Sequence, residues 1–228
     1  MKKTALLLLV SAVFSCRAFA GESKIISYRL PVTRDGQTRT RLAYDFWSGE
    51  YPLPVIDLKS GVKGETKVQA YTSLRKLNKT VDCTIKNGIY NPWSKTASSA
   101  KTYYTISPVV EYEAKEKFIL GEGGIDETDT PHLQPGDRVI DEIPLAEGYC
   151  QFTVVQGKAR RQAQAACDEL RSGEMKLLEA PDGFNEQWIY LSCGEGYDAF
   201  IQDKSLLAVP GAAEGEVIED GKVGPKKP

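Results

Sequence analysis

The chain has 228 residues, with 29 basic residues, 31 acidic residues and one histidine. This length makes one domain of ordinary size or two small ones. The slight acidity offers no attraction to nucleic acid or anionic lipid, so we expect neither as a partner. The chain has a single histidine, which argues against most classes of hydrolase, because histidine is the usual catalytic base near neutral pH.

Residues 1–20 have the three parts of a secretory signal peptide: two lysines, an apolar run over 5–14 and Ala-Phe-Ala at 18–20. The apolar run is shorter than the roughly 20 residues that span a bilayer, and no later segment reaches that length. We therefore expect cleavage after Ala20, a periplasmic or secreted mature chain with a formal charge of −5, and no transmembrane segment. Lipidation at Cys16 is the alternative, although Phe14 stands where that motif has a small residue.

Four cysteines remain after cleavage, and an even number in an exported chain predicts two disulfides. They are Cys83, Cys150, Cys167 and Cys193, and three connectivities are open. The CxxC spacing is absent, so neither a redox motif nor a zinc site is indicated. The competing hypothesis makes one cysteine a nucleophile with His132 as its base, which requires a free thiol.

Frequent turns rich in Gly, Pro and Asn separate short runs of Val, Ile, Tyr and Thr, which predicts a mainly β protein. Glycines predict hairpin turns at 156–157 and 194–196, because glycine accepts positive φ. The expected strands are 24–30, 68–74, 103–112, 137–143, 150–155, 175–180, 188–193 and 197–202.

Residues 158–171 fit two structures. Ala159, Ala163 and Leu170 recur at helical spacing among strong helix formers, which favours a short helix. The alternative is the return strand of a hairpin, with Ala163 and Ala165 on one face.

Composition divides the mature chain. Residues 121–136 are acidic and rich in Gly and Pro, which predicts a linker between an N-terminal β unit (21–120) and a C-terminal one (137–208). Residues 209–228 have almost nothing to bury, which predicts a disordered tail.

Residues 175–207 contain a strand, a turn at Pro-Asp-Gly, a Trp-led strand, a Gly-x-Gly turn, a strand with Phe-Ile, and DKSLL, which predicts one helical turn. This order resembles the last part of a bacterial Src-homology-3-like (SH3-like) domain. The resemblance implies one or two small SH3-like barrel units that bind cell-wall peptides or proline-rich chains, or serve as spacers. Tyr197 matches an aromatic of the family, whereas Ala199-Phe200 replaces its Gly-Trp pair.

The aromatic residues are the candidate ligand-binding residues. Alternation gives Ile189 and Leu191 the core face of their strand and puts Trp188 on the opposite face, where it meets either a ligand or a second layer of protein. Two further tryptophans stand in aromatic clusters at 44–54 and 88–95 and are either ligand platforms or anchors. The full candidate set is Trp188, Tyr190, Tyr197, Phe200, Trp47 and Trp93.

Acidic residues offer weaker candidates. Asp45 with Glu50, and Glu111 with Glu113, are pairs of the kind that cleave glycosides, but 31 acids produce such pairs by chance. A cation could meet Asp126, Asp129 and His132, although the segment lacks the order of an EF-hand loop and fits a solvated linker better. Nucleophile-elbow, phosphate-loop, dinucleotide and His-Glu-x-x-His motifs are all absent, so we predict no enzyme, no metal and no cofactor.

These patterns together favour an exported, non-catalytic binding protein of the bacterial cell envelope. Its expected ligand is a peptidoglycan-derived fragment or an envelope protein, recognised by exposed aromatics. The alternatives are an inhibitor of a lysozyme-like wall hydrolase and a wall-cleaving hydrolase that uses carboxylates.

Overall fold

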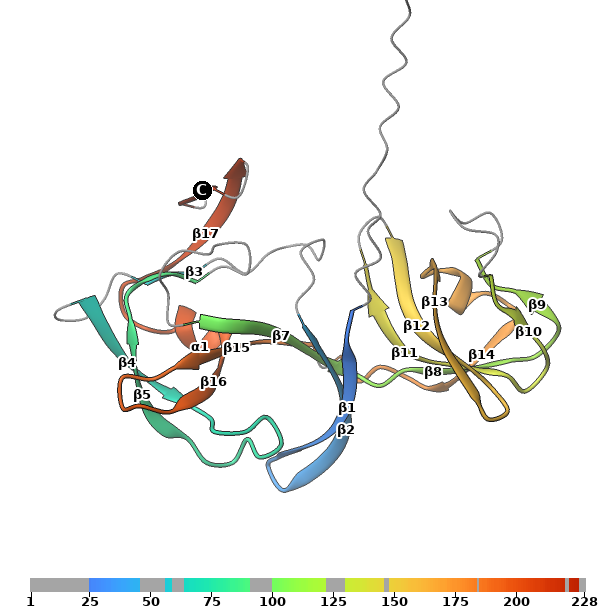
Figure 1. The fold of residues 1–228 in the computed structure, drawn as a ribbon, viewed down its shortest axis with the longest axis horizontal. Coiled ribbons are helices and arrows are strands. Elements are labelled where there is room, and N and C mark those ends of the chain that lie inside the picture. Colours follow the sequence, from blue (N-terminus) through green and yellow to red (C-terminus); the bar gives the residue numbers. More distant parts are fainter. Residues whose placement is uncertain are drawn as a thin grey trace, which may run out of the picture.

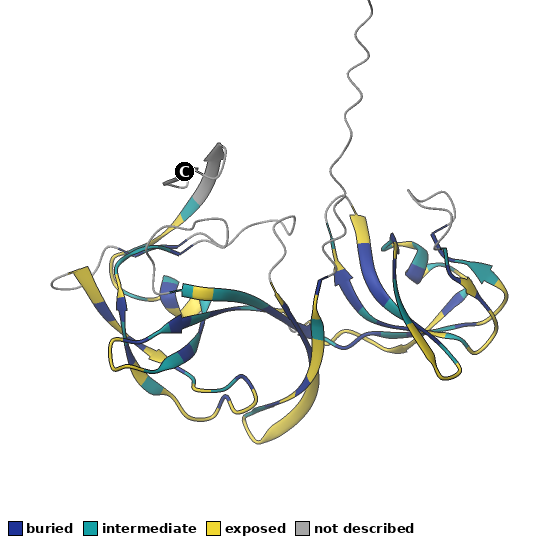
Figure 2. Cartoon of the chain, viewed as in Figure 1, coloured by how far each residue is buried: buried dark blue, intermediate teal, exposed yellow. Residues whose placement is uncertain are grey.

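The computed structural model describes residues 25–45, 56–58, 64–90, 100–121, 130–145, 148–183, 185–219 and 222–225. Strands dominate these residues, as the sequence predicts, and they form two β units that lie side by side (Figure 1). The first unit contains β1–β7 and β15–β18, and the second contains β8–β14. Figure 2 shows buried residues along the strands of both units and exposed ones at the tip of the β1–β2 hairpin.

A five-stranded antiparallel sheet in the order β1-β2-β7-β15-β16 forms the centre of the first unit. Its β1–β2 hairpin curls away from β7, so the sheet has a concave face (Figure 1). Asp35 and Gly36, both at positive φ, make the tight turn of this hairpin. The strands are β1 (Ser27–Arg34), β2 (Gln37–Asp45), β7 (Ala100–Pro108), β15 (Glu186–Ser192) and β16 (Asp198–Gln202).

Further strands and the helix α1 (Asp203–Leu207) cover the other face of this sheet. Ile189 and Leu191 are buried there, which confirms the core face that alternation predicts. DKSLL forms α1, and 194–196 turns β15 into β16, also as predicted. The covering strands are β3 (Ile56–Leu58), β4 (Glu65–Ala70), β5 (Val81–Lys86), β6 (Gly88–Tyr90) and β17 (Ala212–Glu219), and β18 (Lys222–Pro225) pairs with β17.

The tail prediction for 209–228 is wrong for the described residues. β17 pairs with β3, and β18 pairs with β17, so this segment extends a sheet of the first unit. The segment has few apolar residues, so its sequence did not indicate a strand. A strand can still pair through its backbone with the edge of an existing sheet, and this pairing requires little burial of side chains.

The second unit is a five-stranded sheet in the order β13-β12-β11-β8-β14, with a separate β9–β10 pair. Buried apolar residues, among them Phe152 and Leu170, fill its interior. The strands are β8 (Glu111–Ala114), β9 (Phe118–Ile119), β10 (His132–Leu133), β11 (Arg138–Pro144), β12 (Tyr149–Gln156), β13 (Ala159–Ala166) and β14 (Met175–Glu179).

The favoured helix at 158–171 is largely a strand. β13 pairs with β12 along its whole length through a tight turn at Gly157, and only Glu169–Arg171 form a short 3-10 helix. Ala163 and Ala165 share the buried face, as the strand alternative requires. Tertiary pairing thus overrides helix propensity here.

The two units do not follow the predicted boundary at 121–136. β15, from the predicted C-terminal unit, pairs with β7, so the second unit is inserted between two neighbouring strands of the first. The single strand predicted over 103–112 is divided between the two sheets, and the chain crosses at Val109 and Val110. It returns to the first unit between the end of β14 at Glu179 and the start of β15 at Glu186.

One disulfide lies in each unit. Cys83 bonds to Cys193 and joins β5 to the end of β15, while Cys150 bonds to Cys167 and joins β12 to the end of β13. The two predicted disulfides are confirmed, and one of the three open connectivities is selected. Two disulfides are compatible with an extracellular or periplasmic location. Within the described residues, every helix is too short or too polar to cross a bilayer.

We predict that losing Cys83–Cys193 destabilises the chain more than losing Cys150–Cys167. The first bond joins residues 110 apart and the second residues 17 apart. Cys150–Cys167 lies inside the loop that Cys83–Cys193 closes and shortens that loop. The chain-entropy model then assigns Cys83–Cys193 about 1.5 kcal/mol more stabilisation than Cys150–Cys167. Urea unfolding of the two Cys→Ser double variants measures this difference. Equal losses, or a free thiol in the unreduced, denatured chain without residues 1–20, would contradict it.

Candidate functional site

Trp188 is a core residue and not an exposed ligand contact. Its side chain is 1% exposed and packs on the concave face with Leu74 and Leu77, while the Tyr71 ring lies edge-on at 5.6 Å between centroids. The second layer that covers it is the segment between β4 and β5. The prediction that Trp188 contacts a ligand is therefore wrong.

A polar network holds the edge of Trp188. The indole Nε1 donates to Glu186, and Arg34 donates two hydrogen bonds of 2.5 and 2.9 Å to the same carboxylate. Glu186 is nearly buried, and a bidentate arginine pair satisfies both of its oxygens. This pair joins β1 to β15 and so supports the curvature of the sheet.

Partly exposed aromatic side chains extend across the same face beside Trp188. Cross-strand partners share a face, and the register pairs Tyr104 with Trp188 and Tyr190 with Phe200. Tyr28 lies on the same face of the sheet, because its cross-strand partner on β2 is Ala43, which belongs to the same buried cluster as Trp188. We call Tyr28, Tyr104, Tyr190 and Phe200 the aromatic row.

The rings of the aromatic row are close enough to act together. Tyr190 and Phe200 have centroids 4.7 Å apart, and Tyr104 lies 6.1 Å from Phe200. These three are partly buried, whereas Tyr28 on β1 is 45% exposed. The row therefore offers a semi-exposed apolar surface that is already held in shape.

Asp198 organises one end of the row. Its carboxylate accepts hydrogen bonds from Lys101 at 2.7 Å, Ser192 at 3.0 Å and the Tyr190 hydroxyl at 3.1 Å. These donors, Lys101 first, hold the pKa of Asp198 below its usual value. The Lys101 ammonium also lies 5.7 Å from the centre of the Tyr190 ring. A charged pair thus fixes the orientation of Tyr190.

Asp45 lies at the other end, directly across from Tyr104. Partial burial raises the pKa of its carboxyl, and its charge contributes to raised pKa values at Tyr28 and Tyr104, where burial is the larger cause. The aromatic row consequently has a carboxylate beside each end.

Tyr197, another predicted ligand contact, does not join the row. Tyr197 packs against the core on the opposite face, and its hydroxyl donates to the backbone carbonyl of Asp82. Trp47 and Trp93 lie outside the described residues. Among the described residues of the six predicted aromatics, Tyr190 and Phe200 belong to the row. Tyr28 and Tyr104 were not predicted, because the pairings that join β2, β7 and β15 connect segments distant in sequence.

The acidic and nucleophilic candidates find no support as reactive groups. Glu111 forms an ion pair with Arg138 on the face of β8 opposite the buried Tyr112. Cys83, Cys150, Cys167 and Cys193 are all in disulfides, so none of them offers the free thiol that the nucleophile hypothesis with His132 requires. Glu50, Asp126 and Asp129 lie outside the described residues.

Two clusters in the described part of the chain have the spacing of metal ligands, but each consists of a disulfide and one glutamate: Cys83, Cys193 and Glu195, and Glu142, Cys150 and Cys167. Disulfide sulfurs are not the thiolates that bind metal ions. These clusters therefore do not indicate a metal site.

No protein-family model matches the chain, and neither a curated protein nor a solved structure matches it.

We predict that Trp188→Ala destabilises the protein by about 3–5 kcal/mol, because it opens a cavity under Tyr71 and leaves Glu186 without one donor. Chemical denaturation measures the free energy of unfolding. Tyr149→Ala, at a 36% exposed position of β12, is the control and should cost far less. A loss below about 1 kcal/mol at Trp188 would show that the site is not core.

Proposed function

We propose that this chain is an exported, non-catalytic binding protein of the bacterial cell envelope that binds peptidoglycan-derived glycan through the aromatic row. The observation that carries the proposal is the connected set Tyr104, Phe200 and Tyr190, partly exposed on one face. A sugar ring has an apolar face and polar edges. Tyrosine and phenylalanine rings suit the first, while carboxylates accept hydrogen bonds from hydroxyl groups.

The positions of the polar groups support this ligand class. Asp198 and Lys101 lie at one end of the row and Asp45 at the other, so they would hydrogen-bond to hydroxyl groups of different sugars along a glycan strand. The hydroxyls of Tyr28 and Tyr104 add further donors and acceptors. Periplasmic export after a signal peptide at 1–20, to which the two disulfides are suited, would bring the protein to the wall.

Glycan cleavage is the less favoured function, because the two carboxylates of the row are too far apart. The strand of Asp45 lies three strand spacings from β16, which is about 14 Å across the sheet. The residue of β16 in register with Asp45 is Gln202, and it lies four residues from Asp198, which is about 13 Å along the strand. Glycosidase carboxyl pairs are about 5–9.5 Å apart. This separation supports binding without hydrolysis.

The SH3-like resemblance adds modest support. It implies a binding groove made by aromatics of the segment that includes β15, β16 and α1, and the row takes Tyr190 and Phe200 from these strands. The proposal rests on the row itself, since β14, which belongs to the same resemblance, pairs with β8 in the other unit.

Sedimentation with insoluble peptidoglycan tests the proposal. We expect Tyr190→Ala to weaken binding about ten-fold, equivalent to about 1.4 kcal/mol for one lost stacking ring. Tyr190→Phe, which keeps the ring and loses the bond to Asp198, should fall between Tyr190→Ala and the wild type. Tyr149→Ala should bind normally. Equal binding by all variants would refute the row as the site.

Two further assays separate the alternative functions. Inhibition of lysozyme by the wild type, with no binding to the wall, would favour an inhibitor. Release of labelled wall fragments that Asp45→Asn or Asp198→Asn abolishes would favour a hydrolase.

We also predict that the contribution of Asp198 to wall binding resists mild acid. The pKa of Asp198 is depressed in the folded chain, so its interactions are fully present above the usual aspartate pKa of about 3.9 and are lost only as the pH falls through the lower value. In an Asp45→Asn background, which removes the other carboxyl of the row and its raised pKa, binding at pH 5 should therefore equal binding at pH 7, while adding Asp198→Asn should weaken binding at both. A midpoint of loss above pH 5 would contradict the role of Asp198.

A further inference from the structure

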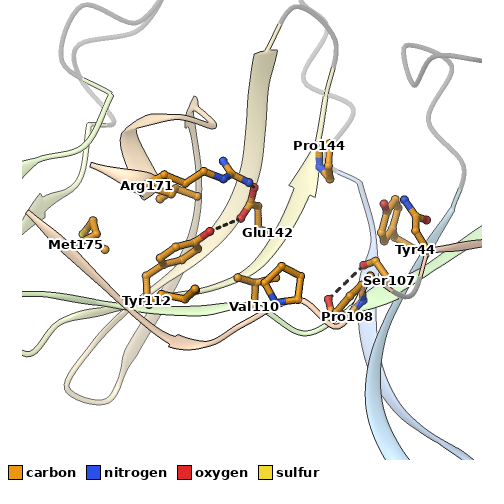
Figure 3. Close-up of a pocket in the computed structure, with 14 residues that line it drawn as sticks. Tyr44, Ser107, Pro108, Val110, Tyr112, Glu142, Pro144, Arg171 and Met175 are labelled. Atoms are coloured by element: carbon orange, nitrogen blue, oxygen red, sulfur yellow. Dashed lines mark hydrogen bonds and ion pairs between the residues drawn. The ribbon is translucent and has the colours of Figure 1, made fainter. Parts of the chain in front are cut away.

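A cavity of about 500 Å³ lies where the two units meet, apart from the aromatic row. Figure 3 shows Tyr44, Ser107 and Pro108 of the first unit on one side and Tyr112, Glu142 and Arg171 of the second on the other. The volume is within the range of small-molecule sites, about 300–1,000 Å³. Most of the remaining lining is apolar: Val110, Pro144, Leu170, Met175, Leu177 and Pro181.

A β-bulge turns one carboxylate into this cavity. The register of β11 with β12 shifts between Ile140 and Ile143, and Asp141 takes a φ of +60°. Bulges re-aim side chains, and left-handed backbone at a non-glycine residue is a local strain found at functional sites. Asp141 consequently pairs with Arg29 of β1, while Glu142 points inward and is 7% exposed.

The protein itself satisfies both oxygens of Glu142. The Tyr112 hydroxyl donates to Oε2 at 3.0 Å, and Arg171 Nη2 donates to Oε1 at 2.5 Å (Figure 3). Burial, followed by the charge of Glu142, raises the pKa of Tyr112 to about 12, so its hydroxyl remains a donor at physiological pH. Glu142 therefore fixes Arg171 in place.

Arg171 has further hydrogen-bond donors beyond those that bind the protein. The guanidinium carries five N–H donors; one binds Glu142 and another binds the carbonyl of Cys167. The side chain is 54% exposed, so the remaining donors are accessible. Glu142 and Arg171 are the only charged residues lining the cavity among those described, and they offset one another. A ligand here thus needs oxygen acceptors for Arg171 and an apolar body for the walls.

We propose that this cavity binds an acyl chain, with Arg171 donating hydrogen bonds to the carboxylate or ester oxygens at the head of the chain. Leu177 and Met175 of β14 contact the chain on the side of the second unit, and Pro108 contacts it on the side of the first. A free fatty acid and an acyl ester of a lipid share this chemistry. The site is independent of wall binding by the aromatic row.

Titration calorimetry of the mature chain tests this site with three twelve-carbon probes below their micelle concentrations. Dodecanoate represents a free fatty acid, monododecanoylglycerol an acyl ester, and dodecyltrimethylammonium a chain of equal length without acceptor oxygens. We expect saturable 1:1 binding of dodecanoate, the glycerol ester or both, and at least ten-fold weaker binding of the ammonium probe. Binding of one acyl probe alone identifies the source of the chain.

Adjacent leucines of β14 provide a matched pair of variants. Leu177 and Leu178 are 47% and 43% exposed, so neither is needed for the core, but only Leu177 lines the cavity. Leu177→Asp should weaken acyl binding at least ten-fold and Leu178→Asp less than two-fold. Arg171→Gln should also weaken it, with the exposed Arg160→Gln as the control. Melting temperatures verify that each variant is folded.

Three results would overturn the proposal: no saturable binding of either acyl probe, equal binding of the ammonium probe, or equal losses in the two leucine variants. Loss of acyl binding in Leu177→Asp with normal sedimentation on peptidoglycan would show that the two sites are separate.

Discussion

The antiparallel pairing of β7 with β15 is the constraint on which the rest of the structure depends. It joins residues 100–108 to residues 186–192, with the whole second unit closed as a loop between them. The two segments that connect the units therefore start at the same end of one sheet. The pairing also brings Tyr104 beside Trp188, which builds the aromatic row, and sets the second unit against Pro108, which creates the cavity.

Ion pairs brace the junction between the units. Arg29 binds Asp141 at 2.6 Å, and Arg39 and Arg41 bind Asp182 in the returning segment at 2.6 and 2.8 Å. The solvent-exposed Arg29–Asp141 and Arg39–Asp182 pairs contribute about 0–1 kcal/mol each, so they orient the units more than they stabilise them. Arg41 is buried, so its bond to Asp182 also satisfies a charge that is removed from water. The aromatic row, in contrast, lies within one unit. The two proposed sites would thus respond differently to movement between the units.

Local signals in the sequence predicted strands that overlap β1, β4, β7, β8, β11, β12 and β14–β16, two hairpin turns, the core face of β15 and the turn of α1, because each depends on neighbouring residues. Trp188 was misassigned since its cover, Leu74 and Leu77, comes from more than 100 residues earlier and has no local signature. The sequence analysis treated 103–112 as one strand, although Pro108 marks the point where it divides. Proline has no backbone N–H to donate to a neighbouring strand. The cavity could have been suspected only from Glu142, the second of two acids inside an otherwise apolar strand.

The nesting of the disulfides has a consequence for biogenesis. A chain threaded into an oxidising compartment from its N-terminus presents Cys83 first and Cys150 next, yet the native partner of Cys83 is the last cysteine to arrive. Oxidation in order of emergence would trap a wrong bond between sequential thiols, and escape from it requires thiol–disulfide exchange. Under the proposed export, formation of the native disulfides should accordingly depend on an isomerase and not only on an oxidase.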